Sequence, residues 1–157
     1  MITTYRKAPP NKETFQIKPI KKLLKKYVGL AFLDAFPYPF DLDALDCLKS
    51  FDTESEKGIV LDPPYSDRQL IESYKKIGGM SIIGNPSYWA KIKDEAGRVC
   101  MPGGIVISFG WNSTGLGACR NFEKLEILLV NHGAQHNDTI VTVERKMANL
   151  NDFWNHK

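Results

Sequence analysis

The residues best suited to chemistry are Asp62, Pro63, Pro64 and Tyr65, which follow the apolar run 57–61. Two consecutive prolines stiffen the chain and carry no N–H, so the Asp62 carboxylate and the Pro63 carbonyl both remain acceptors. Tyr65 adds a flat aromatic ring beside them. Two acceptors next to an aromatic face suit a planar group with an exocyclic amino group, such as a flipped adenine or cytosine. The motif therefore predicts recognition of an amino-bearing base.

Buried strands are needed to position this motif. Residues 30–33 and 57–61 are short apolar runs typical of buried strands, and each run is followed by an acid, Asp34 or Asp62. A third run of this kind ends at Phe109. Ligands of open α/β sheets bind at the carboxyl ends of the strands. We therefore expect Asp34, Asp62 and the loop after Phe109 to lie along one rim.

The segments between these strands have the three- and four-residue apolar spacing of helices. We predict a short helix through Leu42, Leu45 and Leu48, capped by Asp41 or Asp43. The other predicted elements are a helix at 67–77, a Gly-rich loop at 78–86, a helix at 87–99, and a turn at Pro102-Gly103-Gly104 that leads into strand 105–109.

The N-terminal region holds an uneven share of the positive charge. Residues 1–16 are polar and contain Pro9-Pro10, which predicts an extended basic arm rather than a packed element. Residues 17–27 have apolar positions three and four apart, which predicts an amphipathic helix ending near Gly29. Eight Lys and Arg residues stand in the first 26 against the single acid Glu13. The lysines either line a solvated helix face or meet phosphates.

The C-terminal part is predicted to form two consecutive strands rather than strands alternating with helices. Residues 125–130 and 139–143 are rich in β-formers, and the polar, Gly-containing segment 131–137 suits a hairpin connection. Strands alternating with helices and closing in an antiparallel hairpin predict an α/β sheet with a mixed edge. No internal repeat interrupts this pattern.

Composition limits the classes of protein that fit. The 157 residues are 43% hydrophobic, which suits one domain with an ordinary core. A formal net charge of +3 excludes a histone-like or strongly acidic protein. The three cysteines form no CxxC pair, so neither a disulfide framework nor a cysteine zinc site is indicated. No run approaches the roughly 18 apolar residues of a membrane span, and we expect a cytoplasmic protein without a membrane partner.

The motifs together resemble those of the amino-group DNA methyltransferases that carry a DPPY motif, in particular small phage-type, adenine-specific enzymes. The resemblance covers nearly the whole chain, from residues 11–20 through DPPYSDRQ to the strand at 102–112. It implies a Rossmann-like methyltransferase sheet, mostly parallel, in a single domain spanning residues 1–157. It also implies DNA as substrate and S-adenosylmethionine as cofactor, with no metal.

The resemblance further implies roles for particular residues. Asp62 and the Pro63 carbonyl would hold the amino group, Pro64 belongs to the same rigid turn, and Tyr65 would stack on the extruded base. Transfer would be a direct displacement that needs positioning and electrostatics rather than a covalent base intermediate. The residues implied on the cofactor side are Phe15, Lys18 and Pro19, then Asp34, Ala35 and Phe36, then Asp43 and Ala44.

One departure from this pattern concerns the cofactor side. A nucleotide-binding sheet places a helix and a second strand after its first strand, and an acid roughly 20 residues on binds the ribose. Here Asp34 and Asp43 are only nine positions apart, and no acid other than Asp41 suits the ribose. A catalytically impaired subunit that binds nucleic acid or a partner is therefore an alternative, and a small-molecule enzyme using S-adenosylmethionine is a third hypothesis.

Other residues carry weaker signals. His132 and His136 are four apart, but they lie in a predicted hairpin loop without a third ligand. Residues 113–117 lack the lysine of a phosphate loop and are expected to form a loop over the cleft. The rings of Trp89, Trp111 and Phe122 are expected in the core or the cleft wall. Target specificity would come from loops such as 76–87, from the basic arm, or from a second subunit.

Overall fold

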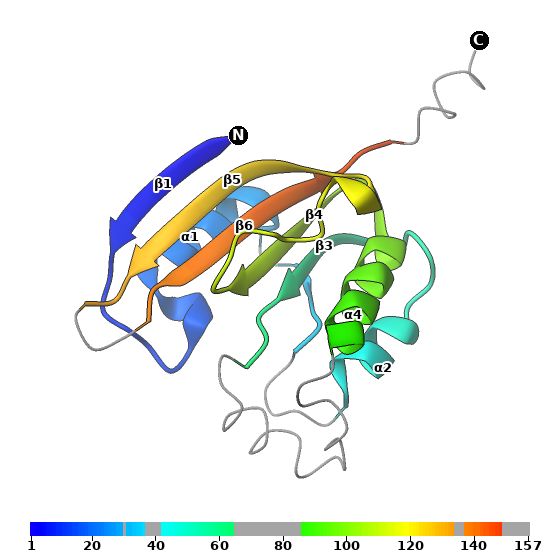
Figure 1. Ribbon diagram of the computed structural model, residues 1–157, viewed down its shortest axis with the longest axis horizontal. Helices are drawn as coiled ribbons and strands as arrows, with labels where there is room; N and C mark the ends of the chain where they lie inside the picture. Colours follow the sequence, from blue (N-terminus) through cyan, green and yellow to red (C-terminus); the bar gives the residue numbers. More distant parts are fainter. Residues whose placement is uncertain (30, 37–41, 65–85, 134–136, 149–157) are drawn as a thin grey trace.

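The computed structural model describes residues 1–29, 31–36, 42–64, 86–133 and 137–148. Its elements are β1 (Ile2–Lys7), η1 (Thr14–Gln16), α1 (Lys18–Tyr27), β2 (Leu33–Asp34), α2 (Ala44–Lys49), β3 (Glu56–Leu61), α4 (Pro86–Val99), β4 (Cys100–Gly110), η4 (Ala118–Arg120), β5 (Phe122–Asn131) and β6 (Thr139–Lys146). The six described strands form one sheet in the order β1-β5-β6-β4-β3-β2 (Figure 1).

Within this sheet, β6 runs against the other five described strands. β2, β3 and β4 are mutually parallel, β6 is antiparallel to both β4 and β5, and β1 is parallel to β5. The predicted α/β fold, with a mostly parallel sheet and a C-terminal antiparallel hairpin, is confirmed. The hairpin does not form the edge of the sheet, because β1 lies outside β5.

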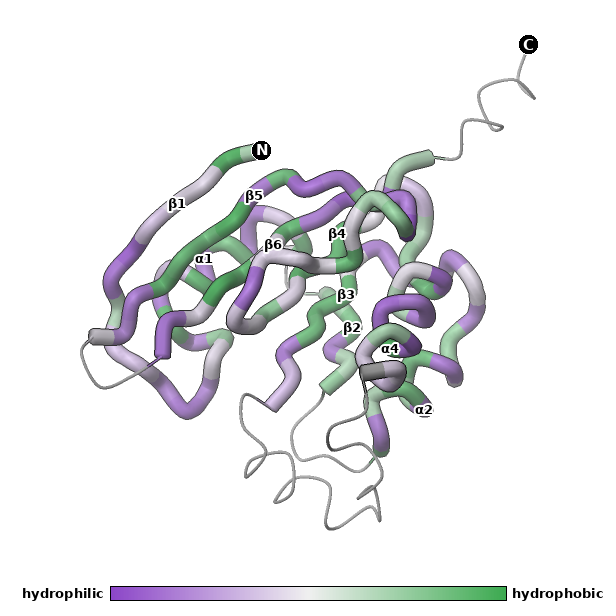
Figure 2. Tube along the Cα trace, in the orientation of Figure 1, coloured by the Kyte–Doolittle hydropathy of each residue, from purple (hydrophilic) through white to green (hydrophobic). Residues whose placement is uncertain are grey.

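Helices cover the two faces of the sheet. α1 lies on one face, where Ile20, Leu23 and Leu24 pack with buried residues of β3 to β6. α2 and α4 lie on the other face, where Leu48 and Ile92 belong to a second buried cluster. Figure 1 shows α1 behind the sheet, and Figure 2 shows hydrophobic residues concentrated along its central strands. A ligand-binding site on this sheet is therefore expected at an end of the strands rather than on a face covered by helices.

The helix predicted after residue 17 is confirmed as α1. Pro19 stands in its first turn, where a missing N–H costs no helical hydrogen bond. The helix stops because Gly29 adopts a φ of 71°, and its N–H donates to the Leu24 carbonyl. The lysines between the buried positions are left on the outside.

The prediction of an extended arm over residues 1–16 is wrong for its first part. β1 pairs in parallel with β5 from Ile2 opposite Glu126 to Lys7 opposite Asn131. Its side chains are mostly exposed, so no apolar alternation marks it as a strand. The backbone hydrogen bonds come from the outer edge of β5, which local sequence does not reveal.

Two strand boundaries also differ from the predictions. Among the described residues 31–33 of the predicted run 30–33, only Leu33 is paired, and with Asp34 it forms the two-residue β2. The Pro-Gly-Gly segment is not a turn before β4 but a bulge within it. Glu56 pairs with Cys100 and Gly58 pairs with Ile105, so a step of two positions on β3 corresponds to five positions on β4.

Several predicted features lie outside the described residues. They are the helix at 67–77, most of the loop at 78–86, Tyr65, Asp41 and His136. The helix predicted at 87–99 is confirmed as α4, and the helix predicted through Leu45 and Leu48 is confirmed as α2, although α2 is capped by Asp43 and does not include Leu42. None of the helices in the described ranges is long and apolar enough to cross a membrane.

Candidate functional site

The carboxyl ends of β2, β3 and β4 meet along one rim of the sheet. Asp34 is the last residue of β2 and pairs with Val60, two positions before Asp62. Leu61 pairs with Ser108, so the end of β4 lies beside the 62–64 segment. Parallel strands in adjacent positions bring these ends together. The predicted rim of Asp34, Asp62 and the loop after Phe109 follows directly from this topology.

The 62–64 segment is anchored by the strand that precedes it. Ile59 and Val60 are fully buried and Leu61 is 5% exposed, so β3 cannot shift without breaking the core. Asp62, Pro63 and Pro64 are half-buried where the chain leaves the sheet. The Asp62 carboxylate and the Pro63 carbonyl are both hydrogen-bond acceptors, and their contact with one amino group stays a prediction. The stacking role of Tyr65 stays a prediction.

Asp34 offers a second carboxylate on the rim. One of its oxygens accepts a hydrogen bond from the Phe36 N–H at 2.9 Å, and the Ala35 N–H donates to the Val60 carbonyl. Burial raises the pKa of Asp34, and the bond from Phe36 opposes that rise. The Ala35 and Phe36 side chains are buried, and the Phe36 ring lies 6.3 Å from that of Trp89. In this segment Asp34 is therefore the side chain suited to a polar contact.

Asp43 has a structural role that the sequence only partly indicates. One carboxylate oxygen caps α2 by accepting from the Leu45 and Asp46 N–H groups, and the other accepts from the Tyr88 hydroxyl at 2.6 Å. This hydrogen bond joins the start of α4 to the start of α2. Ala44 beside it is 1% exposed. Cofactor contacts from Asp43 and Ala44 stay predictions, and Ala44 could contribute only its backbone.

The first predicted cofactor segment lies at the same end of the sheet, against β4. The Phe15 ring packs 5.8 Å from Phe109 and 5.7 Å from Phe32, which places η1 under the end of β4. Lys18 is exposed and Pro19 half-buried in the first turn of α1. Phe15 thus acts in packing, and Lys18 is the polar side chain of this segment that solvent or a ligand can reach.

Glu144 is a buried, hydrogen-bonded acid that sequence reasoning missed. It is fully buried on β6, and its carboxylate accepts from the Leu116 and Gly117 N–H groups at 2.6 and 3.0 Å. Gly115 has a φ of 60°, and a Cβ there would overlap the same carboxylate. Glu144 therefore holds the loop 113–117 on the sheet. In the sequence Val-Glu-Arg-Lys it resembles an ordinary surface acid.

His132 is engaged within the fold. One ring nitrogen lies 2.9 Å from the Ala8 carbonyl oxygen and the other 2.9 Å from the Thr139 hydroxyl. Within the described ranges, no group of three or more His, Cys, Asp or Glu residues could hold a metal ion. His132 joins the segment after β1 to the β5–β6 hairpin.

Comparison with known proteins gives limited matches. No protein-family model and no curated protein matches the chain. Among solved structures, TTHA0409, a "Putative DNA Modification Methylase" from Thermus thermophilus, is similar with a TM-score of 0.46 and 16% identity, over 68% of this chain and 52% of that one. The same protein complexed with S-adenosyl-L-methionine gives a TM-score of 0.43 and 16% identity, over 74% and 53%.

A third similar structure is the 1,6-didemethyltoxoflavin-N1-methyltransferase of Burkholderia thailandensis with bound S-adenosylhomocysteine. Its TM-score is 0.44 at 10% identity, over 92% of this chain and 71% of that one. The chain spans about half the length of the Thermus thermophilus protein. Similarities this low assign no family, and the function proposed below rests on the chain's own residues.

Proposed function

We propose that this chain transfers a methyl group from S-adenosylmethionine to the exocyclic amino group of adenine in DNA. The observation that carries the proposal is the 62–64 segment, which places a carboxylate and a proline carbonyl at the end of a buried parallel strand. Ligand sites of open α/β sheets lie at this position. The direct test is transfer of labelled methyl groups from S-adenosylmethionine to DNA by the full chain.

The chain's own residues would act by positioning and electrostatics. Asp62 and the Pro63 carbonyl would accept hydrogen bonds from the two amino N–H groups, which orients the nitrogen and raises its electron density. One of the two protons leaves to solvent once the nitrogen has gained the methyl group. When bound, S-adenosylmethionine supplies an electrophilic methyl group on a positively charged sulfur. Tyr65 is proposed to stack on the flipped base. Because the acceptors sit on a rigid strand end, little reorganisation is needed during the reaction.

The rim fits the cofactor only in part. Asp34 provides a carboxylate on the edge strand β2, and Lys18 is exposed at the start of α1. In the described part of the chain the sheet ends at β2, so no strand beyond it carries an acid for the ribose. Asp43 already uses both carboxylate oxygens within the fold. Asp34 and Lys18 are therefore the side chains proposed to contact the cofactor.

We expect the isolated chain to bind S-adenosylmethionine weakly. A missing charge-assisted hydrogen bond to the ribose costs roughly 1.5–3 kcal/mol, or about ten- to a hundredfold in affinity. Calorimetric titration should therefore give a Kd in the high micromolar range or above, as an order of magnitude. A Kd below about 1 μM would contradict this expectation and would mean that another residue or a second subunit completes the site.

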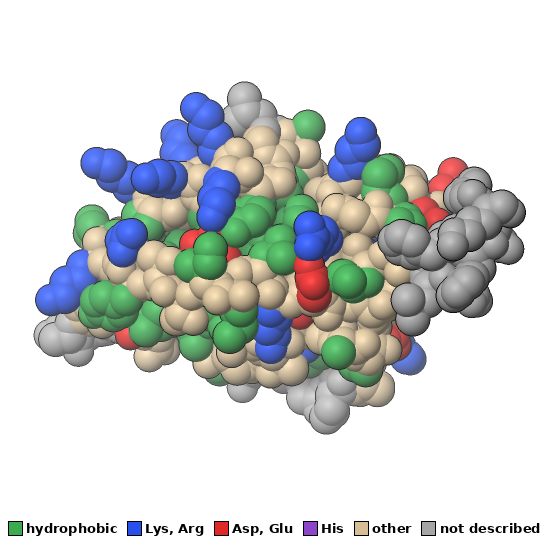
Figure 3. Space-filling model, turned by 90° about the horizontal axis from the view of Figure 1, so that it is seen from above, with side chains coloured by type: hydrophobic (Ala, Val, Ile, Leu, Met, Phe, Trp, Pro, Cys, Tyr) green, Lys and Arg blue, Asp and Glu red, His purple; other side chains and the backbone are tan. Residues whose placement is uncertain are grey.

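DNA contact is proposed for the lysine face of α1. Lys18, Lys21, Lys22 and Lys25 are exposed on this helix. In Figure 3, where the α1 side of Figure 1 is uppermost, Lys and Arg side chains gather toward the upper left. The helix begins at the end of the sheet that carries the rim. A phosphate backbone lying along α1 would therefore also reach the 62–64 segment.

Lys26 is excluded from this set because it is engaged within the fold. Its ammonium group donates to Glu126 at 2.6 Å, and the Tyr27 hydroxyl donates to the same carboxylate at 2.8 Å. Burial alone would raise the pKa of Glu126, but the bonds from Lys26 and Tyr27 outweigh it, and the pKa is lowered. Thr4 of β1 also reaches Glu126, at 3.4 Å. Glu126 therefore links both α1 and β1 to β5, and Lys26 is part of the link to α1.

Replacing Lys21, Lys22 and Lys25 by Gln should weaken DNA binding and flatten its salt dependence. Each phosphate that is no longer neutralised reduces the slope of log K against log salt by about 0.9. The matched control is Lys57→Gln, an exposed lysine near the start of β3, at the opposite end of the strands. If the triple variant and the control have equal slopes, the α1 lysines are a solvated face and do not meet phosphates.

The alternative function is a catalytically impaired subunit that binds nucleic acid or a partner. The observation that favours it is the end of the described sheet at β2, together with the internal use of Asp43. DNA binding without detectable affinity for S-adenosylmethionine would support this alternative. Measurable cofactor binding with methyl transfer to DNA would support the enzyme.

A further inference from the structure

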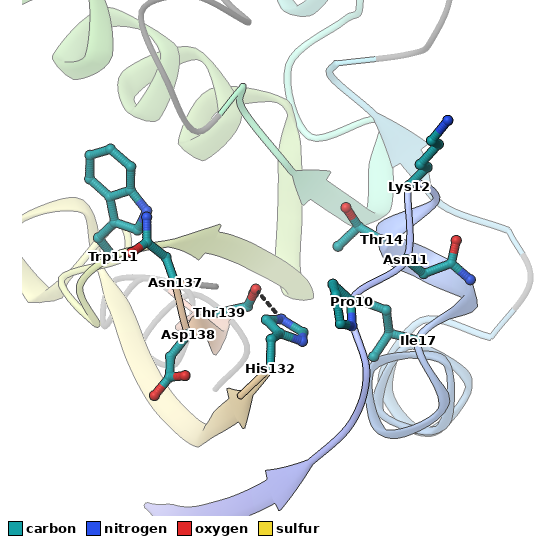
Figure 4. A pocket seen from close by; sticks show the side chains of 10 residues that line it. All are labelled: Pro10, Asn11, Lys12, Thr14, Ile17, Trp111, His132, Asn137, Asp138 and Thr139. Carbon is teal, nitrogen blue, oxygen red and sulfur yellow. Dashed lines mark hydrogen bonds between the residues drawn. The ribbon is translucent and has the colours of Figure 1, made fainter. Parts of the chain in front are cut away.

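A cavity of about 300 Å³ lies at the rim, between the segment after β1 and the β5–β6 hairpin. It shares no lining residue with the 62–64 segment. Its volume is at the lower end of the range for small-molecule pockets. Figure 4 shows the ring of Trp111 and the amide of Asn137 close together on one side, with Lys12 and Thr14 on the other. The cavity therefore combines a flat ring, an amide and a cation.

Trp111 is the most unusual residue of this wall. It follows the last residue of β4, and it is 61% exposed although tryptophan is normally buried to a large extent. Asn137 is also exposed, and its side chain has no hydrogen-bond partner among the described residues. An exposed indole beside an unused amide is a surface that a planar, polar ring would cover.

The remaining wall is held in place by the fold. His132 lies between the Ala8 carbonyl and the Thr139 hydroxyl, at 2.9 Å from each. The Asp138 carboxylate accepts from the Asn131 amide at 2.8 Å. The hairpin and the N-terminal segment are thus tied together across one end of the cavity. A ligand would meet a largely preformed surface, which lowers the entropy cost of binding.

We propose that this cavity binds a nucleobase of a single DNA strand, adjacent to the base presented to Asp62. The base would stack on Trp111, because every base has a π face that an aromatic ring can cover. The Asn137 amide and the Asp138 carboxylate would receive its polar edge. Lys12 would neutralise the attached phosphate. The identity of the neighbouring base, as the one presented to Asp62, rests on the proposed function. Binding of a nucleobase in the cavity does not.

The position of the cavity fits a DNA strand that passes from the 62–64 segment to Trp111. Leu61 pairs with Ser108, so Asp62 lies near the end of β4, from which Trp111 immediately continues. A strand with one base at the 62–64 segment would pass over the end of β4 and bring a neighbouring nucleotide to Trp111. The exposed lysines at the start of α1 continue the positive charge beyond Lys12.

The test is titration of the full chain with a single-stranded oligodeoxyadenylate, without cofactor, at fixed salt. Trp111→Ala should weaken binding roughly 5- to 150-fold, the range expected when one base stack is removed. Lys12→Gln should reduce the salt slope by about 0.7. Tyr5→Ala is the matched control, because Tyr5 is an aromatic residue 50% exposed on β1 and does not line the cavity. Circular dichroism of each variant verifies that the fold is retained.

Three outcomes would overturn the proposal. The first is that Trp111→Ala binds the oligonucleotide as tightly as the unsubstituted chain does. The second is that Tyr5→Ala loses as much affinity as Trp111→Ala. The third is that saturating S-adenosylmethionine displaces the oligonucleotide, which would mean that the cofactor occupies the cavity. Failure of the proposed function is distinguishable from these. Oligonucleotide binding that depends on Trp111, in a chain without methyl transfer, would sustain the base site and remove only the enzymatic activity.

Discussion

Asp62→Ala should abolish most methyl transfer while the protein remains folded. We expect the rate to fall by about 10²–10³ or more, the range seen when one preorganised electrostatic contact to a reacting group is removed. Asp62 stands just after the buried end of β3, at the rim rather than in the core. Labelled methyl transfer to DNA measures the rate, and denaturant unfolding measures stability.

Two comparisons make this prediction specific. Asp52→Ala removes an exposed aspartate before β3, at the opposite end of the strand, and should leave the rate unchanged. Affinity for S-adenosylmethionine should change much less than the rate in Asp62→Ala, because Asp62 is assigned to the base. If Asp62→Ala transfers methyl groups at the rate of the unsubstituted chain, the 62–64 segment does not hold the amino group.

Glu144→Ala should cause a large loss of stability. The substitution leaves the Leu116 and Gly117 N–H groups without their acceptor in the interior, and each unsatisfied group costs about 1–3 kcal/mol. We expect the free energy of unfolding to fall by about 2–4 kcal/mol. The measurement is the midpoint of denaturant unfolding, compared at an unchanged m value.

Glu123→Ala is the matched control for this prediction. Glu123 lies on β5 and pairs with Arg145 at the surface, where an ion pair contributes about 1 kcal/mol or less. Gly115→Ala provides a second variant of the same loop, because its Cβ would meet the Glu144 carboxylate at a φ of 60°. Glu144→Ala and Glu123→Ala with equal midpoints would show that the 113–117 loop does not depend on Glu144.

The local sequence was sufficient to predict α1 and β3. α1 was predictable because Ile20, Leu23 and Leu24 recur at helical spacing and Gly29 supplies the residue at which the helix ends. β3 was predictable because a short apolar run with an acid after it suits a strand buried on both faces. The order of these elements also placed Asp34 and Asp62 at one rim, since parallel strands in a sheet end on the same side.

Tertiary structure alone decided features that depend on residues far apart in the chain. β1 lacks apolar alternation and is a strand because the edge of β5, over 120 residues later, accepts its hydrogen bonds. Asp43 has a cap position that the sequence predicts, but its bond to Tyr88 depends on the packing of α4 against α2.

The candidate base-binding residues could be predicted from local sequence, whereas two residues outside that segment could not. Asp62, Pro63 and Pro64 were predictable as a site because proline chemistry and the preceding strand act within a few residues. Glu144 and Trp111 were not, because the burial of the one and the exposure of the other depend on tertiary packing. A carboxylate has the same local sequence signal on either side of a strand. Only the packed structure determines whether water or two backbone N–H groups satisfy it.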